Sequence, residues 1–251
     1  MSTEIKIIRA YWGNHDSVKS EIPPIPYYEN EIVFVWGKEN EDFLKSRGFK
    51  TRLVVENDPC IIDDSNFLIR KLIVLKLALE EYDEVILLDW DCYLLKRMDK
   101  KFFEFLSEKE TQCPSYGLDH DLLKSLEDCC SHTSLDARFL NARYFTLYSW
   151  KLTDYMVSPN FGLFYTRQKN IGNSLLKIAI ENDLKGCVDE VAFFIYCNCD
   201  FKTYLKKYNP IFVFGVSEKS YNLKYQLSRT QKKYNEYLKS NFKYSLYFEH
   251  N

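Results

Sequence analysis

The chain has 251 residues, enough for one large α/β domain or two small ones. Hydrophobic residues make up 46% of it and charged residues 28%, which is the balance of a soluble globular protein. With a formal net charge of −2, no field of one sign argues for nucleic acid, so we expect no nucleic-acid partner, and local basic patches are the alternative. No apolar run reaches the roughly 18 residues that span a bilayer. The N-terminus also lacks a signal-peptide pattern, so we expect no transmembrane segment and a cytoplasmic location.

The first 95 residues alternate between strand-like and helix-like patterns. The predicted strands cover residues 5–10, 31–36, 49–55 and 84–88. The predicted helices cover residues 41–47, closed by Gly48, and 66–82, N-capped by Asn66. Strands that alternate with helices imply an α/β fold, in which a mostly parallel, Rossmann-like sheet is flanked by helices.

The rest of the chain has a weaker pattern. The predicted helices cover residues 99–108, 171–182, 189–196 and part of 219–239. The predicted strands cover residues 155–165, interrupted at 158–160, and then 211–215 and 242–248. Between residues 113 and 152 we expect loops and short helices. No repeat or linker divides the chain, so we expect a single domain over residues 1–251.

Asp89-Trp90-Asp91, at the end of the apolar run 85–88, is the most informative segment. Its two carboxylates are spaced so that one divalent cation can contact both. Carboxylate oxygens are hard ligands that suit Mg²⁺ or Mn²⁺, and such ions usually also hold substrate phosphates. A buried strand that ends in acids at mid-chain usually faces a ligand crevice. The segment therefore predicts a metal site for a phosphate-bearing substrate, and the alternative is that both acids only solvate a strand end.

The residues around this segment resemble a known family. The stretches 70–73 and 81–91 resemble the core signature of GT-A-fold glycosyltransferases, which use a nucleotide-sugar donor and a D-x-D motif. The resemblance is strongest over residues 66–95. It is weaker over 158–164, which is similar to the family's asparagine–glycine strand beside the sugar site, and over 189–192, which is similar to its acidic helix start.

The resemblance implies a single GT-A-like domain with a nucleotide-binding half at about 1–95 and an acceptor-side half at about 96–251. It implies a metal-dependent glycosyltransferase, of hexosyltransferase type, that uses Mn²⁺ or Mg²⁺. Such an enzyme transfers a sugar from a UDP- or GDP-linked donor to a hydroxyl acceptor on a glycan or glycoconjugate.

The resemblance also implies metal ligands. It makes Asp91 the direct ligand and Asp89 a residue shared between the metal and the donor. Two carboxylates leave the ion coordinatively open, and relatives often add a His near the C-terminus after a late strand. His250 is so placed. The alternative is that His250 belongs to a frayed chain end.

Several residues are candidates for contact with the donor. An aromatic residue at the end of the first strand is suited to stack on the base, a cation is suited to the diphosphate, and an amide is suited to a sugar hydroxyl. Each has a plain alternative, namely core packing, an exposed helix charge or a turn residue. The nucleotide-sugar-binding candidates are Tyr11, Trp12, Arg70, Lys71, Asp89, Trp90 and Asn160.

Asp189 and Glu190 are the candidate catalytic carboxylates. An inverting transferase needs a base that deprotonates the acceptor hydroxyl. A retaining transferase needs a group that stabilises an oxocarbenium-like transition state. The alternative is that both acids stabilise a helix N-terminus through its dipole. The stereochemical course stays open at this level.

Three other classes of protein compete with this interpretation. A haloacid-dehalogenase-type phosphohydrolase also has an apolar strand that ends in D-x-D, but that motif usually lies near the N-terminus, and no later G-D-x-x-x-D is present here. A sugar-nucleotide-forming nucleotidyltransferase needs a Gly-rich phosphate loop after the first strand, where this chain has a single Gly, Gly13. A non-catalytic carbohydrate-binding protein would not explain paired acids at a strand tip.

Overall fold

The computed structural model describes part of the chain, and the short strands near the C-terminus are described by their backbone alone. The described residues are 5–13, 22–23, 25–54, 69–90, 92–94, 97–113, 161–184, 188–197, 212–213, 243–244 and 248–250. Most of the segment 113–152 and the stretches 155–160 and 219–239, for which elements were predicted, lie outside these residues, as does the predicted N-cap Asn66.

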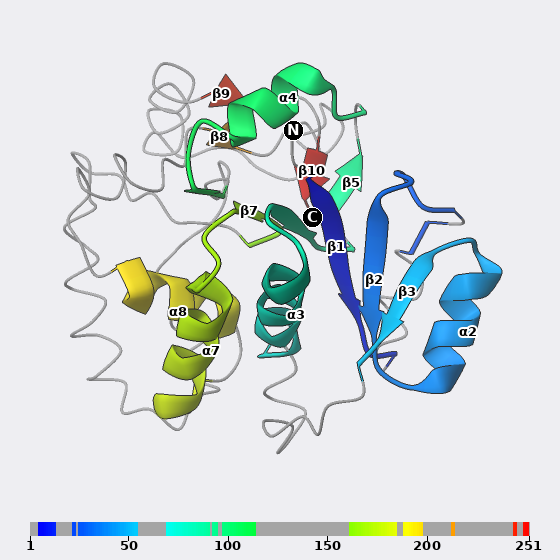
Figure 1. Ribbon diagram of the computed structural model, residues 1–251, viewed down its shortest axis with the longest axis horizontal. Helices are drawn as coiled ribbons and strands as arrows, with labels where there is room; N and C mark the ends of the chain where they lie inside the picture. The colour runs from blue at the N-terminus through cyan, green and yellow to red at the C-terminus, as the bar shows by residue number, and fades with distance from the viewer. Residues whose placement is uncertain are drawn as a thin grey trace, which may run out of the picture.

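A six-stranded sheet forms the centre of the protein (Figure 1), in the order β3-β2-β1-β4-β7-β6. Strands β1 to β4 pair in parallel, and β7 runs antiparallel to both of its neighbours. The predicted α/β class with a mostly parallel sheet is confirmed. The strands are β1 (Lys6–Tyr11), β2 (Glu31–Val35), β3 (Lys50–Leu53), β4 (Val85–Leu88), β6 (Thr111–Gln112) and β7 (Leu163–Thr166).

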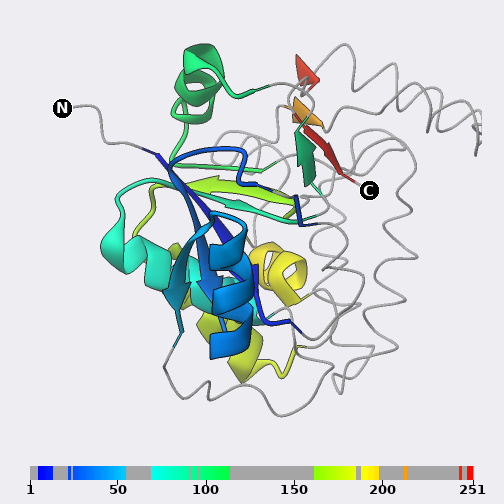
Figure 2. The same ribbon diagram turned by 90° about the vertical axis from the view of Figure 1, so that its right-hand side faces the viewer.

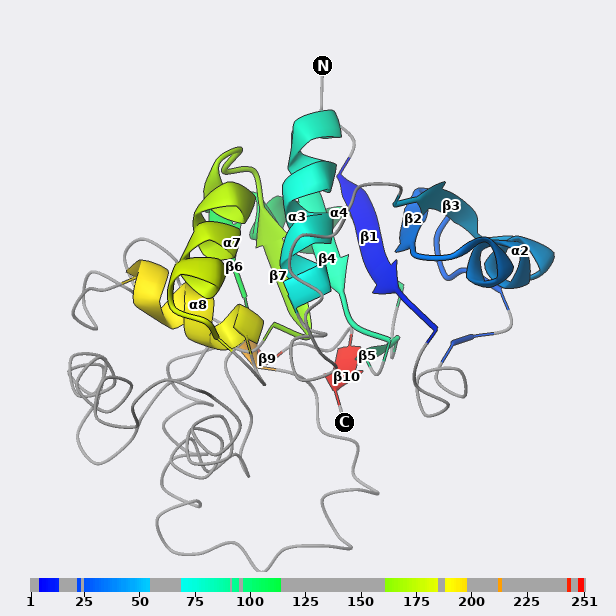
Figure 3. The ribbon, with the colours of Figure 1, turned by 90° about the horizontal axis from the view of Figure 1, so that it is seen from below.

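Helices cover both faces of the sheet (Figures 1 and 3). One apolar cluster joins α3 (Ile69–Glu81), α7 (Ile171–Glu181) and α8 (Val188–Cys197) to one face, and two others join α2 (Lys38–Ser46) and α4 (Lys100–Leu106) to the opposite face. Every residue of β4 is buried because alternate side chains enter the two layers. Among the described helices, none has the length and apolar character needed to cross a membrane.

The helix ends follow the capping chemistry of the sequence. The predicted helix 41–47 is α2, which begins three residues earlier because Gly37, with a φ of 85°, turns the chain out of β2 directly into the helix. Gly48 follows α2 with a φ of 81°, and its N–H donates to the carbonyl oxygen of Lys45, as expected for a helix-ending glycine. Asp99 caps α4 through a bond from the Phe102 amide at 3.1 Å.

The predicted last strand over residues 242–248 was wrong in extent. The chain forms two short strands there, β9 (Lys243–Tyr244) and β10 (Phe248–His250), with different partners. β9 pairs in parallel with β8 (Phe212–Val213), and β10 pairs antiparallel with β5 (Cys92–Leu94). Neither β5 nor β6 was predicted. Strands of two or three residues are too short for a periodic pattern, and only their pairing defines them.

Gly172 lets α7 lie directly against α3. A Cβ atom at this position would lie 2.7 Å from both the backbone nitrogen and the Cα atom of Lys76. We expect Gly172→Ala to lower the free energy of unfolding by about 1–3 kcal/mol, because forcing two packed backbones apart outweighs the helix propensity of Ala, which is worth at most about 1 kcal/mol. Chemical denaturation measures the change.

Asn173→Ala is the matched control, because Asn173 is the next residue of the same helix and is exposed. It should change the free energy of unfolding by no more than about 0.5 kcal/mol. Equal stability of the two variants would contradict the close packing of α3 and α7.

Candidate functional site

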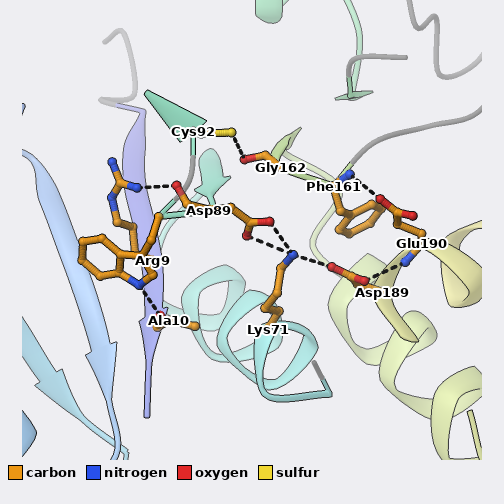
Figure 4. Close-up of polar contacts among 10 residues, drawn as sticks. Arg9, Ala10, Lys71, Asp89, Cys92, Phe161, Gly162, Asp189 and Glu190 are labelled. Atoms are coloured by element: carbon orange, nitrogen blue, oxygen red, sulfur yellow. Dashed lines mark hydrogen bonds and ion pairs between the residues drawn. The ribbon is translucent and has the colours of Figure 1, made fainter. Parts of the chain in front are cut away.

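The D-x-D segment lies where the parallel strands end. Asp89 follows β4 directly, and its backbone N–H donates to the carbonyl oxygen of Gly162 at 2.9 Å, beside the start of β7. The first turn of α3 brings Lys71 to the same edge, and the first turn of α8 brings Asp189 (Figure 4). Ligands of open α/β sheets bind at this edge of the strands. The structure thus brings together Lys71, Asp89 and Asp189, three residues predicted from separate segments.

Lys71 joins the two acidic segments (Figure 4). Its Nζ lies 2.9 Å from Oδ1 of Asp89, 2.9 Å from Oδ2 of Asp89 and 2.5 Å from Oδ2 of Asp189. Lys71 is 6% exposed and Asp189 is 2% exposed, so most of this triad is shielded from water. One ammonium between two carboxylates leaves a net negative charge when both acids are ionised, which suits an additional cation nearby.

The charge of Lys71 is secured by its partners. Burial acts to lower the pKa of Lys71, but the carboxylates of Asp189 and Asp89 outweigh burial, and the pKa lies above its ordinary value. Lys71 therefore stays an ammonium group throughout the physiological pH range. It is a fixed countercharge and cannot serve as a base in that range.

The two candidate catalytic acids have different surroundings. Asp189 accepts from Lys71 through Oδ2, and its Oδ1 accepts from the Glu190 amide at 3.0 Å within the first turn of α8. Glu190 is only half-buried, and its Oε1 accepts from the Phe161 amide at 3.4 Å. Asp189 therefore takes part in an ion pair and also stabilises a helix start, whereas Glu190 lies closer to solvent.

Tyr11 and Trp90, both predicted donor contacts, lie in the core. Trp90 is 8% exposed, and its indole Nε1 donates to the carbonyl oxygen of Ala10 at 2.7 Å. Its ring meets the rings of Tyr11 and Phe49 edge-on, with centroids 6.2 Å and 5.8 Å away. In this arrangement Trp90 ties the D-x-D segment to the end of β1.

Arg70 packs against two neighbouring tryptophans at the ends of β1 and β2. Its guanidinium carbon is 5.7 Å from the ring centroid of Trp12 and 5.6 Å from that of Trp36. The two rings meet edge-on at 6.5 Å, and both are half-buried. Trp12 and Arg70 were predicted, but Trp36 was not. The available signal for Trp36 was its position at the end of the predicted second strand, close to that of Trp12 after the first.

Arg9 and Glu31 were also missed. Both are buried, and Nε of Arg9 lies 2.6 Å from Oε1 of Glu31. Nη1 of Arg9 donates to the carbonyl oxygen of Asp89 at 2.5 Å (Figure 4). The available signal was a charged residue inside the apolar run 5–11, because such a residue requires a buried partner.

The remaining predicted residues are described partly or not at all. Asp91 and Asn160 lie outside the described residues. The backbone of His250, in β10, pairs with that of Cys92 in β5, directly after the D-x-D segment; Figure 2 shows the two strands beside each other. Among the side chains that the structure describes, which do not include those of Asp91 and His250, no group of three or more His, Cys, Asp or Glu is arranged to hold a metal ion.

No known protein family and no curated protein matches the sequence. Several solved structures are similar to the chain. Mouse xyloside xylosyltransferase 1 is 10% identical, with 98% of this chain and 97% of that chain covered and a TM-score of 0.47. The galactosyltransferase LgtC, solved with donor and acceptor sugar analogues, is 14% identical over 76% of this chain and 70% of that chain, with a TM-score of 0.42.

A glycosyltransferase involved in the glycosylation of the major capsid of PBCV-1 is also similar, at 11% identity over 98% of this chain and 92% of that chain, with a TM-score of 0.37. All three are described as glycosyltransferases. At these identities and TM-scores, none of them identifies the substrate or the chemistry of this chain.

Proposed function

We propose that this protein is a metal-dependent glycosyltransferase that moves a sugar from a UDP- or GDP-linked donor to a hydroxyl acceptor on a glycan or glycoconjugate. The Lys71 bridge carries the proposal, because it joins the D-x-D acid Asp89 to the α8 acid Asp189 at the carboxyl edge of the sheet. The alternatives were that Asp89 only solvates a strand end and that Asp189 only stabilises a helix N-terminus. Neither alternative explains why the two acids share one buried cation.

The chemistry of the available residues fits Mn²⁺ or Mg²⁺. Asp91 and Asp89 offer the hard carboxylate oxygens that suit these ions, and His250 offers an imidazole nitrogen as a further ligand. The pairing of His250 with Cys92 supports its inclusion, because Cys92 directly follows Asp91 in the sequence. When bound, the ion neutralises the charge that develops on the nucleoside diphosphate leaving group.

The ion pair of Asp89 supports unequal roles for the two D-x-D acids. Both oxygens of Asp89 face Lys71, so this carboxylate is already neutralised in part and is suited to accept from a ribose or sugar hydroxyl. Asp91 is then the direct metal ligand. Lys71 holds Asp89 and Asp189 in place and offsets part of their negative charge beside the proposed donor site.

The surroundings of the two α8 acids support a division of catalytic work. The carboxylate of Asp189 is buried and held by Lys71, so it orients the site. Glu190 is half-buried and is the better candidate for contact with the acceptor hydroxyl or the reacting sugar. Trp12, with Arg70 and Trp36 beside it, is the candidate surface for the base, since Tyr11 and Trp90 are enclosed by the core.

A thermal-shift screen tests the proposal. UDP, GDP, CMP and their sugars are added with Mn²⁺, with Mg²⁺ or with EDTA. A ligand at 100 times its Kd stabilises the native state by about 2.7 kcal/mol, which for a chain of this size corresponds to a rise in Tm of roughly 5–10 °C. We expect this rise with one nucleoside diphosphate in the presence of metal, and a smaller rise with EDTA.

Two further measurements separate the competing classes. The stabilising nucleotide sugar should be hydrolysed slowly without an acceptor, and a generic phosphate ester should release no phosphate. Phosphate release from that ester would instead support a phosphohydrolase. Stabilisation by free glycans, with no response to metal and nucleotide, would support a carbohydrate-binding protein.

A further inference from the structure

Arg9 is a cation in the middle of the central strand β1. It is fully buried, as is its ion-pair partner Glu31 at the start of β2. Glu31 also accepts from the Tyr27 amide at 3.2 Å through its other oxygen. The guanidinium carbon of Arg9 lies 4.7 Å from the ring centroid of Trp90. A charged pair in this position is part of the sheet interior and lies beside the main chain of Asp89.

The guanidinium of Arg9, on β1, contacts the main chain of the D-x-D segment. The carbonyl oxygen of Asp89 accepts from Nη1 of Arg9 at 2.5 Å and from the Cys92 amide at 3.3 Å. The indole of Trp90, under the same guanidinium, donates to the carbonyl oxygen of Ala10. Trp90, before Asp91, is therefore bonded to β1, and Cys92, after Asp91, is bonded to Asp89. Arg9 contacts both the Trp90 ring and the Asp89 carbonyl oxygen.

Stability alone gives little reason for this pair. Taking two charges out of water is costly, and well-packed apolar residues often replace a buried ion pair without loss of stability. The distinctive feature of Arg9 is its fork of donors, which serves Glu31 and the Asp89 carbonyl at the same time. A lysine ammonium lacks this planar fork geometry.

We propose that Arg9 and Glu31 are positioning residues of the D-x-D site: Arg9 holds the backbone of Asp89, the first residue of the segment, in the place that metal and donor binding requires, and Glu31 holds Arg9. The inference rests on the proposed function, since it assigns the pair a part in metal and donor binding. Removing a group that hydrogen-bonds to a metal ligand and orients it typically lowers metal affinity by roughly 10- to 100-fold.

The test is the double variant Arg9→Met/Glu31→Gln. It removes both charges together, so neither is left buried and unpaired, and the Gln oxygen still accepts from the Tyr27 amide. We expect a Tm close to that of the wild type, with binding of Mn²⁺ and of the stabilising nucleoside diphosphate weakened roughly 10- to 100-fold in calorimetry. We also expect faster hydrogen exchange at the Cys92 amide, measured by NMR without any ligand.

Leu106→Ala is the matched control. Leu106 is buried in α4, outside the D-x-D site, so its truncation should lower Tm without weakening the binding of Mn²⁺ and nucleotide by folded protein. Wild-type affinity and unchanged Cys92 exchange in the double variant would overturn the inference while leaving the proposed function intact. Absence of metal and nucleotide binding in the wild type itself would overturn the proposed function, and with it the positioning role.

Discussion

Lys71→Met should lower the free energy of unfolding by roughly 3–5 kcal/mol and remove transferase activity. The substitution keeps the length and apolar stem of the side chain, but it leaves Asp189 buried without its countercharge and removes the ammonium group that pairs with Asp89. Removing one partner of a buried ion pair costs this much because the other charge stays out of water. Chemical denaturation measures the stability, and a nucleotide-release assay measures the activity.

Lys76→Met provides the matched control on the same helix. Lys76 pairs with Glu80 at 3.6 Å in a partly exposed position, so its replacement should cost no more than about 1 kcal/mol. The double variant Lys71→Met/Asp189→Asn should recover part of the lost stability, because the uncompensated carboxylate is gone, and it should stay inactive. A Lys71→Met protein as stable as Lys76→Met would contradict the buried triad.

Asp91→Ala should reduce metal-dependent activity by about 10³-fold or more while leaving the fold intact. A metal ion supplies several kcal/mol of charge stabilisation in the transition state, and each 1.36 kcal/mol corresponds to a tenfold change in rate. The same variant should lose the metal-dependent rise in Tm with nucleotide. Circular dichroism verifies the fold, and a rate assay at saturating donor with increasing Mn²⁺ measures the loss.

Asp83→Ala is the control for this variant. Asp83 precedes β4 at the opposite end of the strand, where its exposed carboxylate pairs with Lys169 at 2.8 Å. Its replacement should leave both activity and metal response unchanged. If Asp91→Ala keeps full activity in the presence of metal, the D-x-D segment does not bind the ion.

Most of the fold could be predicted from local patterns. The helices 171–182 and 99–108 appear as α7 and α4 within two residues at each end, because apolar periodicity and an Asp cap act within one segment. The strand 84–88 appears as β4 because its apolar residues fill both faces of the sheet. β5, β6 and β10 could not be predicted in this way, since each exists only through a partner distant in the sequence.

The sequence predicted which residues belong to the candidate site better than it predicted how they are arranged. Lys71, Asp89 and Asp189 were all candidates, but their shared ion pair depends on how α3 and α8 pack against the sheet. The burial of Tyr11 and Trp90 could not be predicted, because an aromatic residue beside a strand end has the same sequence pattern whether it is enclosed or open.

The sequence by itself determined the alternation of strands and helices, the acids at the end of the strand 84–88 and the cation at the start of the helix before that strand. These features follow from local hydrophobicity and chemical type. Only the tertiary structure decided which charges meet. Lys71 joins two acids from different segments, and Arg9 joins Glu31 to the backbone of Asp89. The physical reason is burial: a charge inside the protein needs a partner, and packing of distant segments determines which partner it has.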